Sequence, residues 1–179
     1  VRIADLRGYS YDRRDVTGRA LANAYAQTLG AIFTQQTKPY ETEICVAEVG
    51  ATPEDDQLYR LTYDGTIVDE PQFLAMGGQA EALTNEVKGH FTPGLALREA
   101  LAVAVNALGA TGGTNGKPRE LPATQLEVAV LDRTRGKRKF KRITGLALTE
   151  LLPTAAATET VELPEAPADG ADGDQPAGD

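Results

Sequence analysis

The 179-residue sequence predicts an α/β domain of the α+β kind, in which helices stack on sheets built from adjacent strands. Three observations lead to this fold class. The length suits one domain with or without an appendage. Hydrophobic residues make up 41% of the chain, enough for a packed core. The patterns run in the order helix, several strands, two helices, strands and helix, which differs from the strict alternation of parallel α/β folds.

The N-terminal part predicts one long helix. Residues 3–11 are expected to be the last turns of an element that begins upstream, and Asp15 is expected to cap the helix that follows. Apolar residues then recur at helical spacing: Leu21, Tyr25, Leu29, Ile32 and Phe33. The helix must end before Pro39, because the residue ahead of a proline disfavours the helical conformation.

Strands are predicted next. Residues 44–47 are apolar on both faces, which is typical of an interior strand, and residues 58–63 alternate between apolar and polar. Asp64-Gly65 predicts a tight hairpin turn, because glycine tolerates a positive φ angle. A short apolar run at 73–76 ends in two glycines.

The second half predicts a pair of helices. The first covers roughly 80–88. The second is expected to begin with Thr92 as its cap and Pro93 at its first position, and to end at Gly109.

A glycine-rich loop at 110–123 separates these helices from a predicted hairpin. Its strands are expected at 126–132 and 138–143, and a last short helix at 146–152 closes the folded body.

The acidity of the chain is concentrated at its C-terminus. The whole sequence has 18 Lys and Arg against 26 Asp and Glu, a net charge of −8. Residues 153–179 contain seven acids and no base, so residues 1–152 carry a net charge of only −1. Because this segment also lacks aromatic residues, it is predicted to be a disordered acidic tail beyond a domain at 1–152.

The basic residues gather in one segment. Seven of the 18 lie in the predicted hairpin at 133–142. They favour a solvent-facing hairpin whose lysines protect an edge strand. One alternative is a nucleic-acid-binding module that uses this hairpin, and the lack of other basic faces disfavours it. The other is that the hairpin attracts the acidic tail of its own or a neighbouring chain.

The usual signatures of catalysis and metal binding are missing from the sequence. A single cysteine, Cys45, and a single histidine, His90, exclude cysteine-rich or paired-histidine metal sites within one chain. The phosphate-loop pattern fails, since Thr111 replaces its first glycine and Pro118 its hydroxyl residue. No stretch is apolar enough to span a membrane, and the sequence implies no cofactor. A Cys45–His90 catalytic pair is disfavoured, because Cys45 lies among apolar residues within a strand.

The sequence nevertheless resembles the α subunit of the actinobacterial proteasome core particle. The likeness covers nearly all of residues 1–152 and includes loops, such as Lys38-Pro39-Tyr40-Glu41. It is carried, in order, by residues 7–19, 21–23, 25–29, 38–41, 45–49, 58–60, 62–65, 69–71, 76–78, 126–132 and 142–145.

This resemblance implies a four-layer α-β-β-α sandwich of the N-terminal-nucleophile hydrolase type. It also implies that two strands and most of a helix lie upstream of Val1, so the domain is expected to be truncated at its N-terminus. Without those strands the sheets would have exposed edges, and this stretch alone is expected to be unstable or to aggregate.

The resemblance further implies a non-catalytic subunit of a threonine-type protease complex in the cytoplasm. Family members form homo-heptameric α rings, which cap rings of catalytic β subunits, control substrate access and receive a ring-shaped ATPase activator. Their substrates carry a ubiquitin-like tag. The sequence starts with Val1 rather than a processed threonine, which matches the α role. No nucleic-acid or membrane partner is implied, and the gate and activator pocket are expected upstream of Val1.

One family position can be transferred to this sequence. The turn ahead of the Lys-Pro-Tyr motif lines the axial opening of the ring in the family, and here it comprises Thr34, Gln35, Gln36 and Thr37. Polar, uncharged side chains suit a passage for unfolded polypeptides of any sequence. The structural alternative is an ordinary loop from helix to strand.

Two rival functions stay open at this point. A stand-alone N-terminal-nucleophile hydrolase would need a threonine, serine or cysteine exposed by processing. A nucleic-acid-binding module would bind more weakly as the salt concentration rises.

Overall fold

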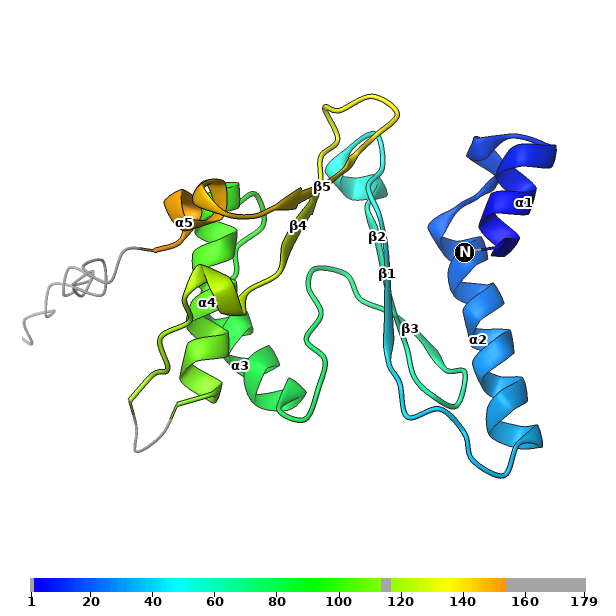
Figure 1. Ribbon diagram of the computed structural model, residues 1–179, viewed down its shortest axis with the longest axis horizontal. Coiled ribbons are helices and arrows are strands. Elements are labelled where there is room, and N and C mark those ends of the chain that lie inside the picture. Colours follow the sequence, from blue (N-terminus) through cyan, green and yellow to red (C-terminus); the bar gives the residue numbers. More distant parts are fainter. Residues whose placement is uncertain (1, 114–116, 154–179) are drawn as a thin grey trace, which may run out of the picture.

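The computed structural model describes residues 2–113 and 117–153. Its elements form two groups, which Figure 1 shows side by side. One group holds the first helices and a three-stranded sheet, and the other holds the remaining helices and a two-stranded sheet. Apart from Pro153, the predicted disordered tail lies outside the described residues.

The first group begins with helices α1 (Arg2–Ser10) and α2 (Gly18–Gln35). The expected cap at Asp15 is wrong, since Asp15 belongs to a 3-10 turn and Thr17 caps α2 instead. The Thr17 hydroxyl accepts a hydrogen bond from the Ala20 amide at 3.1 Å, and the Thr17 backbone is extended, as a capping residue requires.

Helix α2 packs on one face of an antiparallel sheet of β1 (Ile44–Glu48), β2 (Gln57–Leu61) and β3 (Ile67–Asp69), in that order. Alternate strand residues meet the helix because successive side chains point to opposite faces of a sheet. The buried core of this group consists of Ala22, Ala26, Leu29, Val46, Tyr59 and Leu61. The prediction that 44–47 is an interior strand is wrong for the described residues, since β1 is an edge strand and Cys45 is exposed.

The second group contains α3 (Ala80–His90) and α4 (Leu97–Thr111), which pack against each other. The predicted start of α4 at Thr92-Pro93 is wrong. Gly94 follows with φ +88°, a left-handed conformation that interrupts a right-handed helix. The helix starts after Ala96, whose amide donates to the Glu99 carboxylate at 2.8 Å. Its end also differs, because α4 runs through Gly109 to a cap at Gly112.

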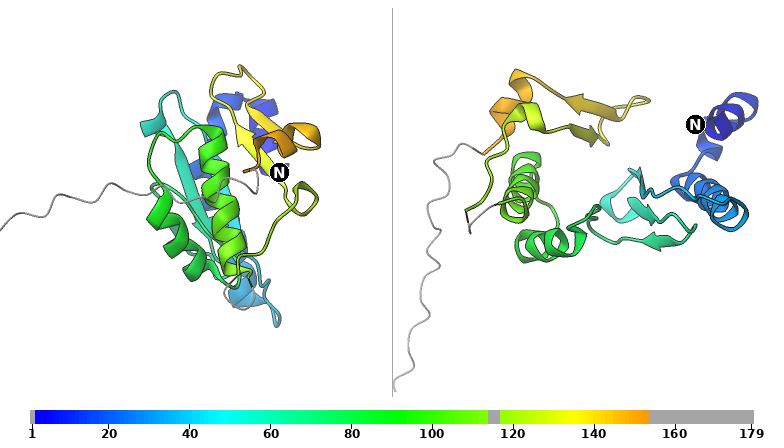
Figure 2. Two further views of the ribbon diagram at one scale, coloured as in Figure 1. Left: turned by 90° about the vertical axis from the view of Figure 1, so that its left-hand side faces the viewer. Right: turned by 60° about the horizontal axis from the view of Figure 1, so that its bottom comes forward.

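The predicted hairpin and last helix are present with slightly shorter bounds. Strands β4 (Val128–Leu131) and β5 (Phe140–Ile143) are antiparallel, and α5 (Leu146–Leu151) follows. Ile143 and Leu148 are buried together with Leu101 of α4, which gives this group a core of its own. Figure 2 shows that α2 and the α3–α4 pair lie on opposite outer sides, with the two sheets between them.

One set of polar contacts links the β4–β5 hairpin to the turn between β1 and β2. The Arg133 guanidinium donates to both Asp56 carboxylate oxygens, at 3.1 and 2.8 Å, and to the Gly50 carbonyl at 2.9 Å. The Lys139 ammonium donates to the Val49 carbonyl at 3.2 Å. We call these contacts the Arg133–Asp56 clamp. They fix the two groups relative to each other.

Replacing Asp56 tests the clamp. Hydrogen bonding by Arg133 is the main cause that lowers the pKa of Asp56. A lowered carboxyl pKa stabilises the fold above the unfolded-state pKa of about 3.9, and this contribution is lost as the pH falls through the lower folded-state value. We therefore expect Asp56→Asn to lower Tm at pH 7, and the difference from wild type to shrink in thermal melts taken at acid pH.

The Asp12–Arg14 pair provides the matched control. It is also bidentate, at 3.1 and 2.9 Å, but it joins neighbours in one turn and its arginine is 90% exposed. Exposed local pairs contribute little to stability. An equal loss of Tm in Asp12→Asn and Asp56→Asn would contradict a special role for the clamp.

Candidate functional site

The four residues predicted to line a pore lie at the C-terminal end of α2, at the lower right of Figure 1. The expected turn is partly helical: Thr34 and Gln35 form the last residues of α2, Gln36 caps it, and Thr37 follows. All four side chains are exposed. The helix ends at Gln35, ahead of Lys38-Pro39 as predicted, and its last turn includes the first two residues of the expected turn.

The hydrogen bonding of this helix end leaves most side chains unengaged. The Thr34 hydroxyl donates to the Gly30 carbonyl at 3.0 Å, and the Gln36 amide donates to the Ile32 carbonyl at 3.0 Å. Within the described ranges, the side chains of Gln35, Gln36 and Thr37 make no hydrogen bond. Their amide and hydroxyl groups can therefore contact a passing polypeptide or solvent.

The end of α2 is held in place by the turn between β2 and β3. Gly65 has φ +88°, and a Cβ placed on it would lie 2.6 Å from the Ala26 carbonyl oxygen and 2.9 Å from Gly30. The helix and turn backbones can approach this closely only because position 65 is glycine. Phe33 of α2 stacks at a tilt on Tyr63 with ring centroids 5.6 Å apart.

The turn itself is ordered by Asp64. Its carboxylate accepts hydrogen bonds from the Thr62 hydroxyl and from the Thr66 amide and hydroxyl. The Thr62 hydrogen bond is the main cause that lowers the pKa of Asp64. A closed Asx-type turn of this kind presents Gly65 to α2 in one conformation.

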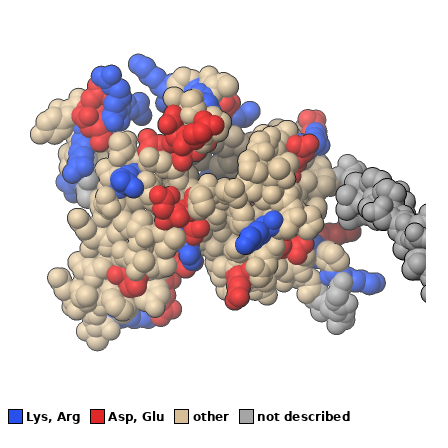
Figure 3. Space-filling view, turned by 180° about the vertical axis from the view of Figure 1, so that it is seen from behind, with Lys and Arg blue, Asp and Glu red and all other residues tan. Residues whose placement is uncertain are grey.

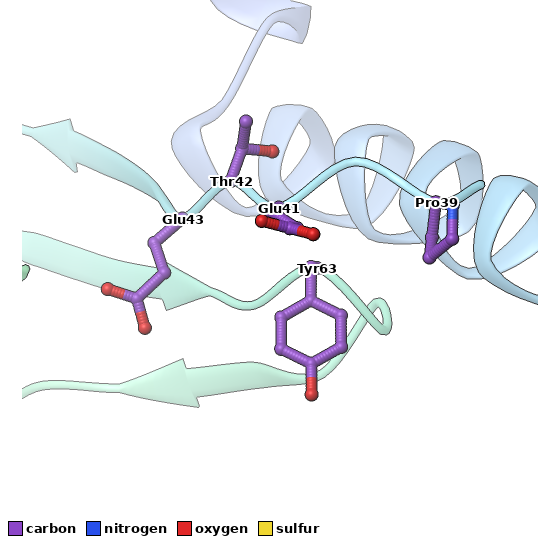
Figure 4. Close-up of a pocket in the computed structure, with 5 residues that line it drawn as sticks. All are labelled: Pro39, Glu41, Thr42, Glu43 and Tyr63. Atoms are coloured by element: carbon purple, nitrogen blue, oxygen red, sulfur yellow. The ribbon is translucent and has the colours of Figure 1, made fainter.

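A shallow, open depression of about 490 Å³ lies beside this helix end. Pro39, Glu41, Thr42 and Glu43 from the segment before β1 line it, with Tyr63 opposite, as Figure 4 shows. In the part of the chain that the structure covers, no group of three or more His, Cys, Asp or Glu is placed to hold a metal ion.

The structure does not bring Cys45 and His90 together as a catalytic pair. Although Cys45 is exposed, desolvation by its neighbours raises the pKa of its thiol, which disfavours the thiolate that a nucleophile needs. His90 is the last residue of α3, and its Nδ1 lies 3.0 Å from the Glu86 carbonyl oxygen of its own helix. Among the helices at 2–113 and 117–153, none has the length and apolar character of a membrane span.

Comparison with known proteins identifies the family. The sequence profile described as "Proteasome subunit" matches residues 2–122. The chain is also 60% identical to the proteasome subunit alpha of Salinispora tropica over 172 residues, which covers 96% of this chain. The chain belongs to the proteasome subunit family. The expected resemblance to actinobacterial α subunits is thereby confirmed.

Two further relatives agree with this assignment. The proteasome subunit alpha of Geodermatophilus obscurus is 59% identical over 94% of the chain, and that of Saccharopolyspora erythraea is 66% identical over 86%. The chain spans 66%, 65% and 59% of the lengths of these three proteasome relatives. The family profile ends at residue 122, so the basic hairpin lies outside its match.

Sequence reasoning missed two parts of this region. It recognised Asp64-Gly65 as a turn but not that Gly65 receives Gly30 of α2, since spacing within one segment does not show which helix crosses a turn. It also missed the Arg133–Asp56 clamp, whose partners lie 77 residues apart. The bases around Arg133 gave no signal that distinguished a structural arginine from its neighbours.

A methyl group at Gly65 tests the close approach. Gly65→Ala forces a left-handed conformation on alanine and places its Cβ against the Ala26 carbonyl, so we expect a loss of about 1–3 kcal/mol in the free energy of unfolding. Chemical denaturation measures it. Gly136→Ala is the control, because a Cβ there meets nothing within 4 Å. Equal midpoints for the two variants would contradict this account of the α2 end.

Proposed function

We propose that this protein is a non-catalytic α subunit of the bacterial proteasome core particle. In this role it forms the homo-heptameric outer rings, controls substrate access to the catalytic β subunits and docks a ring-shaped ATPase activator. The particle degrades proteins marked with a ubiquitin-like tag, and it works in the cytoplasm. The observation that carries the proposal is the 60% identity to a proteasome subunit alpha across 96% of the chain.

The arrangement of the sheets supports the four-layer fold that this role implies. The face of β1 and β2 that α2 leaves uncovered carries Ala47 and Leu58, and both line a hollow together with Leu131 of β4. The uncovered faces of the two sheets therefore meet at this hollow. With α2 outside one sheet and α4 outside the other, this order matches an α-β-β-α sandwich (Figure 2).

Exposed apolar side chains support a role within an assembly. Tyr9 and Tyr11 are 96% and 82% exposed, and Leu6 of α1 and Phe140 of β5 are also largely exposed. In the described residues, more large hydrophobic side chains are exposed than fully buried. Exposed apolar side chains of this kind suit contacts with other subunits.

The end of α2 supports the pore assignment of Thr34, Gln35, Gln36 and Thr37. Its exposed side chains are polar and uncharged, and its backbone is held by the β2–β3 turn. A rigid rim of this chemistry would neither trap nor repel an unfolded chain by charge. The close approach of Gly65 to α2 holds the backbone of this helix end in place.

Assembly with the β partner is the deciding experiment. The full gene product, co-expressed with its β subunit, is expected to elute as a large complex and to show stacked seven-fold rings by electron microscopy. A monomer beside the β subunit, or peptide cleavage by the gene product alone, would overturn the proposal. Salt-sensitive nucleic-acid binding that falls on charge reversal at 133–142 would instead support the rival binding module.

Charged substitutions at the helix end test the pore assignment. Gln35→Arg combined with Gln36→Arg narrows the opening and adds positive charge, so we expect slower degradation of unfolded protein by the assembled particle. Asn23→Arg combined with Gln27→Arg, at exposed positions on the same helix, controls for the two added charges. Degradation rates of an unstructured substrate provide the measurement. Rates equal to those of the control would remove these residues from the pore.

A further inference from the structure

The β4–β5 hairpin carries many more basic than acidic side chains. Residues 128–149 contain seven Lys and Arg and a single acid, Asp132, which accepts hydrogen bonds from the Thr134 amide and hydroxyl. Two of the bases, Arg133 and Lys139, are engaged in the Arg133–Asp56 clamp. We call the other five the free hairpin cations: Arg135, Lys137, Arg138, Lys141 and Arg142.

The free hairpin cations face solvent and form no ion pair within the described residues, and Asp132 acts on Arg135 and Lys141 only through space. All five are exposed, and across residues 2–113 and 117–153 none has a carboxylate oxygen within 4 Å. Of these five side chains, only that of Arg135 makes a hydrogen bond within the described residues, to the Phe140 carbonyl at 3.3 Å. Figure 3, which views the molecule from behind, shows basic side chains next to acidic ones at the top of the molecule, the end at which Figure 1 places the tip of this hairpin.

The clamp keeps this surface in place. The bidentate Arg133–Asp56 contact and the Lys139–Val49 hydrogen bond attach the base of the hairpin loop to the β1–β2 turn. The Asp132 amide donates to the Lys139 carbonyl at 2.9 Å and closes the loop. The cations are therefore presented by a fixed backbone, which lowers the entropy lost when a partner binds.

The acidic C-terminal segment starts beside this surface. Leu148 of α5 is buried in the same cluster as Ile143 of β5, and Leu151 and Leu152 pack against that cluster. The chain therefore leaves α5 next to the end of β5, a strand of four residues that is about 13 Å long. From Pro153, a chain reaches at most about 20 Å to Glu159 and about 40 Å to Glu165.

Charge, reach and connectivity all point to one partner. We propose that the acidic segment 154–179 of the same chain binds the free hairpin cations. The segment supplies seven carboxylates and no base, against a net charge of +6 over 128–149. Each exposed pair is weak, but a tethered segment acts at an effective concentration in the millimolar range, so several weak pairs suffice. The segment would also shield the hairpin from nucleic acids and other polyanions.

Zero-length carbodiimide cross-linking of the full chain tests this contact, because it joins a lysine amine only to a carboxylate that touches it. We expect Lys137 and Lys141 to link to Glu159, Glu162, Glu165 or Asp169. Lys38, Lys88 and Lys117 are internal controls on other parts of the surface. Raising the salt from about 0.01 M to about 1 M shortens the Debye length from about 30 to about 3 Å and should abolish these links.

Charge reversal provides the matched variants. The double variant Lys137→Glu, Arg138→Glu keeps Lys141 as a cross-linking site, and we expect it to lose the links between Lys141 and the acidic segment. Lys88→Glu on α3 should leave those links unchanged. These positions are exposed, so the fold is retained. Isotopically mixed chains separate links within one chain from links between chains. The proposal is overturned by links spread evenly over all lysines, by links that persist at high salt, by links only between chains, or by none.

A second measurement checks the shielding. A chain ending at Leu152 should bind a short single-stranded oligonucleotide more tightly than the full chain does, and the difference should disappear in Lys137→Glu with Arg138→Glu. Equal affinity of the two chains would contradict an acidic segment seated on the hairpin. Neither experiment depends on ring assembly, so their outcome is independent of the proposed proteasome role.

Discussion

The contact between Arg133 and Asp56 is the main polar link between the two halves of this chain. Each half has its own core, one between α2 and the three-stranded sheet and one between α4, α5 and the two-stranded sheet. Buried apolar residues hold each half together, but the described cores do not merge into one. A bidentate arginine–carboxylate pair has a fixed, planar geometry, so it sets direction as well as distance. The position of the hairpin depends on this pair.

The same contact distinguishes the basic side chains that are hydrogen-bonded to the fold from those that face solvent. Arg133 and Lys139 are committed to Asp56, Gly50 and Val49, whereas their basic neighbours are exposed. A count of bases in the sequence treats all seven alike. The distinction matters for function, because a cation already hydrogen-bonded to the fold contributes little to binding a partner.

Much of the fold could be predicted from periodicity, and the errors have local causes. The helical spacing of Leu21, Tyr25 and Leu29 and the turn at Gly65 were sufficient to predict α2 and the hairpin that receives it. The caps were harder to predict, because Asp15 and Thr17 are both good capping residues two positions apart. Ile44–Ala47 is apolar on both faces, yet β1 lies at a sheet edge in the described structure, because the pattern within one strand does not show whether a further strand pairs with it.

The candidate site was predictable only by resemblance. Nothing in the spacing of Thr34 to Thr37 distinguishes a pore rim from a loop, and the geometry adds a fixed helix end whose Gln35, Gln36 and Thr37 side chains are unengaged. The clamp could not be predicted at all, because its partners are far apart in sequence and neither belongs to a recognisable motif.

The exposed side of β1 has a practical consequence. Cys45 is the chain's only thiol, and it lies on the sheet face that α2 does not cover. A segment or subunit that covers this face of the sheet also covers the Cys45 thiol. The alkylation rate of this single sulfur atom therefore serves as an intrinsic gauge of how closed the interior is, without any engineered label.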